Sequence, residues 1–265
     1  NQDHFEKGWT FKDHQWQKIN KYKPDLVYDK CRTNYETIVV KENISKKIPI
    51  LNSPKFELIA NDKSVTSLFF EDISPKTLFI TSFSDIVGFL KSFQSTRVVI
   101  KPSIGSGGKG VKVVEKEKIL KKEINLKQGI LLQEFIDTSS GIPGLVEGTH
   151  DLRVVLINNQ ILYSYIRIPQ KDSFLCNVSQ GGFMKTVKEK DIPKKIIEQV
   201  NKIQKKFCKL EPLIYSIDFM VNQESKPFLV EINSRPGILF NKEDKDLQVE
   251  VYTKMIQLFK DILEK

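Results

Sequence analysis

The chain has 265 residues, 40% of them hydrophobic and 28% charged, which is enough to bury one or two cores and excludes intrinsic disorder and fibrous repeats. Its net charge of +9 favours a polyanion, a nucleotide or an acidic substrate as partner. Only five of the basic residues are arginines and 37 are lysines, so a solvated, lysine-rich surface is the simpler explanation of the charge.

The cysteines and the apolar runs limit the cellular context. Cys31, Cys176 and Cys208 lie far apart without a CxxC spacing, and only three histidines accompany them. This pattern argues against a disulfide framework or a zinc site and favours a reducing cytoplasm. No apolar run approaches the roughly 18 residues of a membrane span, and the polar start lacks a signal-peptide core. Because the first residue is not methionine, a missing N-terminal piece is left open.

The first 50 residues are mostly polar. We expect a polar lead-in, then a short strand at 25–28, an amphipathic stretch at 35–42 and an apolar run at 48–51. These segments are little more than the tail of an α/β unit.

A helix should begin after Asn61-Asp62-Lys63, because the side chain of Asn61 or Asp62 can cap its free N–H groups. Its apolar face is formed by Val65, Leu68 and Phe69. Pro75 is expected to end this helix.

From residue 97 the character of the sequence changes to that of strands, and residues 111–115 alternate between apolar and polar. The expected elements are a strand at 98–101, a glycine-rich loop at 102–110, a second strand at 111–115 and a lysine-rich helix at 116–122. A third strand at 130–136 then leads into a hinge loop between lobes at 138–148. The last third is expected to contain two strands, a helix, two more strands and a closing helix, at 152–157, 161–168, 193–209, 215–221, 228–232 and 247–263. The closing helix has apolar residues at helical spacing, which predicts core packing for Val251, Met255, Leu258, Phe259 and Ile262.

The glycine-rich loop Gly105–Gly110 satisfies G-x-G-x-x-G, a pattern that is weak by itself. A dinucleotide-binding interpretation requires a helix directly after the loop, whereas a strand follows here. The loop does not fit Walker A, and kinases place their ATP-binding lysine after the loop, whereas Lys101 precedes it. What remains is a hairpin loop whose backbone N–H groups can approach phosphate, with Lys101 at its base. An ordinary mobile surface turn is the alternative.

Three oxygen-bearing side chains are predicted to meet on two neighbouring strands. Glu231 and Asn233 lie two residues apart on one strand and therefore point to the same face, and Asp218 can join them if the strands pair. Hard oxygen ligands without nitrogen or sulfur suit Mg²⁺, which takes its remaining ligands from water and substrate phosphates. The alternative is a salt bridge to Arg167 or Arg235.

Taken together, these motifs resemble those of the ATP-grasp enzymes over about residues 50–265. The resemblance is strongest to bacterial glutathione synthetase and the ribosomal-protein glutamate ligases. It is carried by Lys63, Lys101 with its loop, Gln133–Ile136, Arg153, Arg167, Asn177, Asp218, Glu231 and Asn233. Tyr28–Lys30 and Asn177–Gly182 are also similar to ATP-grasp proteins associated with spore coats.

The resemblance implies an α+β ATP-grasp fold, in which two α+β subdomains sandwich the nucleotide after a shortened α/β N-terminal remnant. The implied units are a remnant of the N-terminal lobe at 1–60, a lid subdomain with the glycine-rich loop at 61–136, and a C-terminal subdomain with the magnesium site at 137–265.

The resemblance also implies a role for each site residue. The α- and β-phosphates of ATP would be held by Lys63 and Lys101, and the γ-phosphate covered by Ser106, Gly107 and Gly108. Adenine would meet the backbone of Gln133, Glu134, Phe135 and Ile136, and the ribose would meet Asp151. Two Mg²⁺ ions, or Mn²⁺ in their place, would be coordinated by Asp218, Glu231 and Asn233. The transferred phosphoryl group would be faced by Arg153 and Arg167, and the substrates by Asn177, Gly181, Gly182 and Arg235.

The implied reaction is an ADP-forming ligation of a carboxylate to an amine through an acyl phosphate, on an amino acid or peptide. Such phosphoryl transfer depends on charge neutralisation and alignment rather than on a protein nucleophile. The alternative is a catalytically degenerate ATP-binding module with a role in regulation or spore-coat assembly. A nucleic-acid binder rests on net charge alone, so neither nucleic acid nor membrane is expected as partner, and a homo-oligomer is left open.

Two positions depart from the resembling families. Leu175 stands two residues before Asn177, where those families usually carry an arginine, which alters the carboxylate pocket. Arg235 stands before Pro236 where they carry a smaller residue, and it is expected either to recognise an acidic substrate or to form a structural salt bridge. The N-terminal lobe is also reduced to about fifty residues, so either the chain is truncated or the substrate is held differently.

Overall fold

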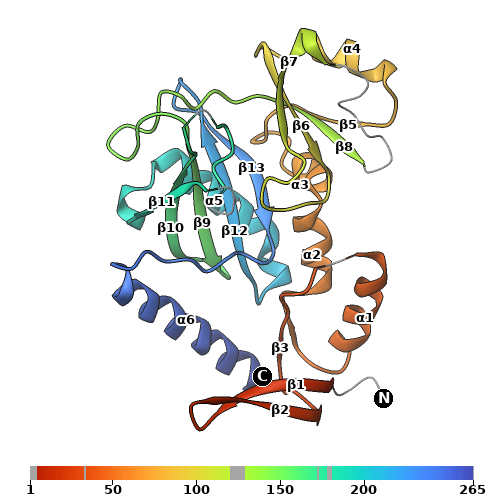
Figure 1. The fold of residues 1–265 in the computed structure, drawn as a ribbon, viewed down its shortest axis with the longest axis vertical. Coiled ribbons are helices and arrows are strands. Elements are labelled where there is room, and N and C mark those ends of the chain that lie inside the picture. Colours follow the sequence, from red (N-terminus) through yellow and green to blue (C-terminus); the bar gives the residue numbers. More distant parts are fainter. Residues whose placement is uncertain (1–4, 33, 120–128, 172, 178–180, 265) are drawn as a thin grey trace.

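A computed structural model describes residues 5–32, 34–119, 129–171, 173–177 and 181–264 of the chain. Its strands are β1 Phe5–Lys12, β2 Gln15–Tyr22, β3 Val27–Tyr28, β4 Ile50–Leu51, β5 Thr77–Ile80, β6 Arg97–Pro102, β7 Lys112–Glu115, β8 Ile130–Glu134, β9 Asp151–Ile157, β10 Gln160–Ile168, β11 Phe183–Val187, β12 Ile214–Val221 and β13 Pro227–Asn233. Its α-helices are α1 Tyr35–Ser45, α2 Pro54–Asn61, α3 Lys63–Phe69, α4 Ser84–Leu90, α5 Lys194–Phe207 and α6 Lys245–Leu263. Figure 1 shows the two larger sheets apart from each other, with α2 and α3 beside the space between them.

The smaller sheet has the strand order β5-β8-β6-β7, and all its pairs are antiparallel. The expected hairpin of β6 and β7 is confirmed, with Val99 opposite Val113 across the glycine-rich loop. Strand β5 and helix α4 were not expected, because each is short and lacks a clear apolar period. The expected lysine-rich helix is only a 3-10 turn at Lys116–Lys118, because Ile119 is already extended, and residues 120–122 lie outside the described residues.

The larger sheet has the order β11-β10-β9-β12-β13 and is antiparallel throughout. Side chains on β9 alternate between its two faces. Leu152, Val154 and Leu156 pack in a core with residues of α5, whereas Val155 and Ile157 pack in a core with residues of α6. The sheet therefore lies between two helices, as Figure 1 shows. Of the residues expected on the inner face of α6, Val251, Met255 and Leu258 are buried, and Phe259 and Ile262 are partly buried.

Helix α3 begins where the sequence predicted, because the Asp62 side chain accepts a hydrogen bond from the Ser64 backbone N–H. It ends at Phe69, well before Pro75, so the expectation that the proline ends it was wrong. Phe70 leaves the helical conformation and buries its ring in the core instead. Helix α2 precedes α3 and was not expected, although Ser53 caps it and Pro54 stands at its first position.

The N-terminal region contains more structure than the polar lead-in that we expected. Strands β1 and β2 form an antiparallel hairpin, in which aromatic and polar residues alternate and Asp13 and His14 turn with positive φ. The short strands β3 and β4 pair in parallel, consistent with the expected strand and apolar run. The two main sheets fall within the second and third units expected from the sequence, but the unit boundaries themselves stay a prediction. Within the described residues, every helix is too short or too polar to cross a bilayer.

Candidate functional site

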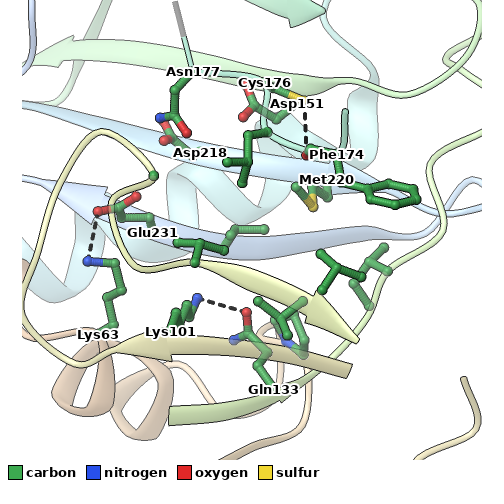
Figure 2. A pocket seen from close by; sticks show the side chains of 18 of the residues that line it. Lys63, Lys101, Gln133, Asp151, Phe174, Cys176, Asn177, Asp218, Met220 and Glu231 are labelled. Atoms are coloured by element: carbon green, nitrogen blue, oxygen red, sulfur yellow. Dashed lines mark hydrogen bonds and ion pairs between the residues drawn. The ribbon is translucent and has the colours of Figure 1, made fainter. Parts of the chain in front are cut away.

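A cavity lies between the two sheets, beneath the glycine-rich loop (Figure 2). We call it the nucleotide cavity, after the ligand expected from the sequence. It has two walls: the lid wall, formed by α3 and the smaller sheet, and the sheet wall, formed by the larger sheet. The lid wall contributes Lys63, Lys101, Ser106, Gly108, Gln133, Glu134, Phe135 and Ile136. The sheet wall and the segment between β10 and β11 contribute Asp151, Arg167, Phe174, Leu175, Cys176, Asn177, Asp218, Met220, Val230 and Glu231. Most residues predicted from the sequence therefore meet at one place.

Two lysines of the lid wall point toward this cavity. Lys63 is the first residue of α3, and its backbone N–H donates to the Ser103 carbonyl oxygen. Its Nζ lies 3.2 Å from Glu231 Oε1 and donates to the Gly105 carbonyl oxygen at 2.7 Å. Lys101 is buried on β6 and donates to Gln133 Oε1 at 2.8 Å. Burial lowers the pKa of Lys101 to about 8, with Glu231 opposing the shift and Lys63 adding to it. A bound anion would stabilise this buried ammonium group.

The acidic residues of the sheet wall are held by arginines. Arg153 donates to both oxygens of Asp218 at 2.6 Å, and Arg167 donates to Asp218 Oδ2 at 2.7 Å. Arg167 also binds Asp151 through two hydrogen bonds of 2.6 and 2.7 Å. Burial alone would raise the pKa of Asp218, but the two guanidinium groups outweigh it and hold the pKa at about 2. The salt bridge to Arg167 that the sequence left open is therefore present, with Arg153 as a second partner.

The oxygen-bearing side chains of β12 and β13 are placed by strand register. Asp218 is the direct cross-strand partner of Glu231, and a bulge follows this pair and adds Val230 to the cavity wall. Asn233 faces Glu231 Oε1 at 3.3 Å and Arg153 Nη2 at 3.2 Å. The described residues contain no group of three or more His, Cys, Asp or Glu side chains suited to a metal. Two carboxylates and an amide nevertheless form an all-oxygen donor set, which fits Mg²⁺ completed by water and phosphate oxygens.

The glycine-rich loop crosses the cavity and approaches the sheet wall. Gly107 and Gly108 have φ values of 67° and 72°, a conformation that other residues adopt at a cost. A Cβ atom on Gly108 would lie 2.7 Å from Asn177 Oδ1. A side chain at position 108 would therefore be strained and would push the Asn177 amide aside, and this close approach suits a loop that covers phosphate.

The segment Gln133–Ile136, which covers the end of β8 and the two residues after it, is partly used by the fold itself. The Gln133 side chain joins Lys101 to Thr77 Oγ1, and the backbone N–H of Glu134 donates to the Lys76 carbonyl oxygen. Phe135 lies below the guanidinium of Arg97 at 4.2 Å and packs edge-on against Phe174. Contact of this segment with adenine stays a prediction. The aromatic pair of Phe135 and Phe174 is suited to packing against a flat ring.

The remaining predicted residues lie around the cavity rather than in its wall. Arg153 stands behind Asp218, and Gly107 sits at the tip of the loop. Gly181 and Gly182 precede β11, and the N–H of Gly182 donates to the Asn177 carbonyl oxygen at 3.3 Å. Arg235 and Asn233 line a second cavity, which shares Gly105, Ser106 and Glu231 with the first. Arg235 donates to the carbonyl oxygen of Cys31.

The sequence analysis missed Phe174, Met220 and Arg97. Met220 follows Asp218 by two residues on β12 and therefore shares its face, so alternation alone could have identified it. Phe174 and Arg97 become neighbours only through the tertiary fold, with 5.0 Å between the Arg97 guanidinium carbon and the Phe174 ring centre. No sequence pattern signals that contact.

Comparison with known proteins assigns this architecture. Residues 59–259 match the family described as the RimK-like ATP-grasp domain. The chain is 26% identical over 226 residues to the tetrahydromethanopterin:alpha-L-glutamate ligase of Methanocaldococcus jannaschii, covering 80% of this chain and 72% of that protein. It is 28% identical over 168 residues to a probable alpha-L-glutamate ligase of Coxiella burnetii, covering 62% of this chain and only 51% of that protein.

Solved structures share the fold at low sequence identity. The D-alanyl-alanine synthetase A of Vibrio cholerae matches with a TM-score of 0.68 at 17% identity, over 98% of this chain and 88% of that one. The D-cycloserine synthetase DcsG matches with a TM-score of 0.62 at 13% identity, over 86% of this chain and 78% of that one. The expected α+β ATP-grasp fold is therefore confirmed. This chain belongs to the RimK-like ATP-grasp family.

Proposed function

We propose that this chain is an ADP-forming carboxylate–amine ligase that acts on an amino acid or a peptide. One observation carries the proposal: opposite charges face each other across a single cavity. Lys63, Lys101 and the glycine-rich loop lie on one wall, and Asp218 and Glu231 lie on the other. A nucleoside triphosphate requires both, because cations and backbone N–H groups bind its phosphates and oxygen ligands hold the metal ions attached to them.

We propose a role for each residue that is consistent with its position. Lys63 and Lys101 bind the α- and β-phosphates, and Ser106, Gly107 and Gly108 exclude water from the γ-phosphate. Asp218, Glu231 and Asn233 hold two Mg²⁺ ions, which when bound neutralise the phosphate charge and polarise the transferred group. Arg167 lines the cavity and faces that group, whereas Arg153 acts from behind Asp218 by fixing its carboxylate. Asp151 is assigned to the ribose and the segment Gln133–Ile136 to adenine.

The reaction proceeds in two balanced steps. A substrate carboxylate oxygen attacks the γ-phosphorus of ATP, ADP leaves, and an acyl phosphate forms. The amine nitrogen then attacks the acyl carbon, inorganic phosphate leaves, and the amine gives up a proton as the amide forms. The substrates are assigned to the side of the cavity near Asn177, Gly181 and Gly182. No protein nucleophile is needed, since alignment and charge neutralisation lower the barrier.

The substrate class is supported by similarity alone. Two relatives are named alpha-L-glutamate ligases, and an amino-acid substrate is proposed here on that basis. The cytoplasm is part of the same proposal, because Cys31, Cys176 and Cys208 are free thiols.

The test is ADP release from Mg²⁺-ATP with a panel of amino acids, dipeptides and acidic peptides as substrates. The variant carrying Asp218→Asn and Glu231→Gln serves as the blank. We expect ADP formation that depends on one panel member and disappears in the variant. Tight Mg²⁺-ATP binding without turnover on any member would favour the binding-module alternative, and failure to bind ATP would overturn the proposal.

A further inference from the structure

Helix α6 lies on the outside of the larger sheet (Figure 1) and carries two apolar stripes along its length. One stripe contains Val251, Met255 and Leu258 and is buried against residues of that sheet. The residues of the other stripe are spaced alternately three and four positions apart, and they are Val249, Tyr252, Ile256, Phe259 and Leu263. We call it the outer stripe. Its spacing is that of the a and d positions of a coiled coil, which pack against a second helix.

The outer stripe is largely open to solvent in the described part of the chain. Val249 is 66% exposed, Ile256 is 53% exposed and Leu263 is 52% exposed. Tyr252 is 42% exposed, and Phe259 is partly buried against the core. The centre of the outer stripe lies about 100° around the helix axis from the centre of the buried stripe, so the packing of α6 on its own sheet leaves the outer stripe uncovered. A continuous apolar patch of this kind marks an interaction surface.

Two opposite charges stand beside the outer stripe, one near each end of the helix. With the stripe residues at positions a and d, the flanking e positions are Asp246, Thr253 and Lys260, and all three are exposed. On another face of the helix, Lys254 is paired with Glu250 at 2.7 Å. By contrast, neither Asp246 nor Lys260 uses its side chain in a hydrogen bond or ion pair with another described residue. Both charges are therefore available to a partner that covers the outer stripe.

An antiparallel pair of α6 helices would cover the outer stripe and pair these charges at the same time. Asp246 and Lys260 each lie seven residues from Thr253. When Thr253 of one helix faces Thr253 of the other, each Asp246 therefore faces a Lys260. The same register sets a residues of one stripe against d residues of the other, for example Ile256 against Tyr252. A parallel pair would set each e position against a g position, which on this helix faces the chain's own core, and would leave both charges unpaired.

We propose that the outer stripe is a self-association surface, across which two copies of this chain form a symmetric antiparallel helix pair with Asp246 of each copy facing Lys260 of the other. A second copy fits this surface because the stripe is self-complementary both in its apolar layers and in its flanking charges. This inference goes beyond the proposed function and does not depend on it. One helix of 19 residues per copy is a small contact compared with the about 800 Å² per partner of a standard interface, so we expect a reversible dimer with a micromolar dissociation constant.

The experiment is sedimentation velocity of the full chain at concentrations from about 1 to 200 µM. We expect the mass to rise from that of a monomer to that of a dimer over this range. Ile256→Lys places a charge at the centre of the outer stripe and should weaken the dimer at least about tenfold. Because Ile256 is half exposed, this variant should fold normally, and its thermal unfolding at the lowest concentration checks that it does.

Charge reversal tests the antiparallel register. Asp246→Lys and Lys260→Asp each replace two opposite-charge contacts by two like-charge contacts, so each variant alone should dimerise about tenfold more weakly. An equimolar mixture of these two variants should form a heterodimer, because one chain then carries two lysines at the e positions and the other two aspartates. The matched control is Asp261→Lys, which makes the same charge change on the opposite face of α6 and should leave the dimer unchanged.

Three results would overturn the inference. A monomer at every concentration would show that the outer stripe does not bind a second copy. A dimer that persists in Ile256→Lys would place the contact elsewhere on the molecule. Single charge reversals that dimerise like the unaltered chain, or a mixture of the two that stays monomeric, would exclude the antiparallel pairing of Asp246 with Lys260.

Discussion

The two walls of the nucleotide cavity treat buried charge in opposite ways. On the sheet wall, Asp218 and Asp151 are each bound by a guanidinium group, and their charges are compensated within the fold. On the lid wall, buried Lys101 has a neutral hydrogen-bond partner, Gln133. The difference teaches that the sheet wall is built to keep its shape without a ligand, whereas the lid wall is stabilised when an anion arrives.

Breaking the ion network of the sheet wall should give the largest effect on stability and turnover. Asp218→Asn removes the charge that faces Arg153 and Arg167, and loss of one partner in a buried ion network costs about 3–5 kcal/mol of unfolding free energy. Turnover should be lost as well. Urea unfolding and ADP release measure the two effects.

The control for this variant is Asp72→Asn, which breaks an ion pair with Lys202 whose two side chains are about half exposed. Exposed pairs contribute about 0–1 kcal/mol, so its unfolding curve should hardly move. If both variants lose the same stability, the compensation assigned to the sheet wall is wrong.

The contact between the walls can be tested at Gly108. Gly108→Ala places a Cβ atom 2.7 Å from Asn177 Oδ1 and adds about 1–2 kcal/mol for a left-handed alanine, so we expect roughly tenfold weaker Mg²⁺-ADP binding. Asn177→Ala in the same chain should restore part of the affinity by removing the overlap. Gly105→Ala is the matched control, since its Cβ atom meets only Pro102 Cγ at 3.2 Å. A stronger effect at position 105 than at 108 would contradict this account.

The buried charge of Lys101 on the lid wall should make ADP binding depend on pH. With a pKa of about 8, Lys101 loses its proton between pH 7 and 9, and ADP binding should weaken by up to about tenfold over this range. Lys101→Arg stays charged, so its ADP affinity should not change with pH. Protein stability should move the other way: the unfolded lysine holds its proton to higher pH, so Lys101 adds stability as the pH rises from about 8 toward 10.5. Parallel pH curves for the two proteins would exclude this role of Lys101.

Local patterns were sufficient for the long strands and for the start of α3. Apolar runs predicted β6, β9, β10, β12 and β13, alternation predicted β7, and the cap at Asp62 predicted where the helix begins. Strands β5 and β11 were missed because short edge strands depend on their neighbours for stability rather than on their own sequence.

The sequence offered the salt bridge between Asp218 and Arg167 as an alternative, but the full ion network of the sheet wall could not be predicted, because it depends on register. Asp218 lies directly opposite Arg153 on β9, and Asp151 lies directly opposite Arg167 on β10. A shift of one residue in either pair would separate the charges, and sequence periodicity does not fix that register. The sequence therefore supplied the residues of the site, and the fold decided which of them are paired.

The smallest expected effect on ADP binding comes from Arg97. Its side chain joins the two walls of the nucleotide cavity. The guanidinium carbon of Arg97, on the smaller sheet, lies 4.2 Å from the Phe135 ring centre. It lies 5.0 Å from the ring centre of Phe174, which belongs to the sheet wall. Cation–π contacts of this kind contribute about 0.5–1 kcal/mol, so Arg97→Ala should weaken ADP binding about two- to fivefold. Arg97→Lys should retain part of the affinity. Pyrophosphate carries no adenine, so its affinity should be the same in all three proteins; a matching loss for pyrophosphate would show that Arg97 acts on the phosphates, and that the aromatic pair does not hold the base.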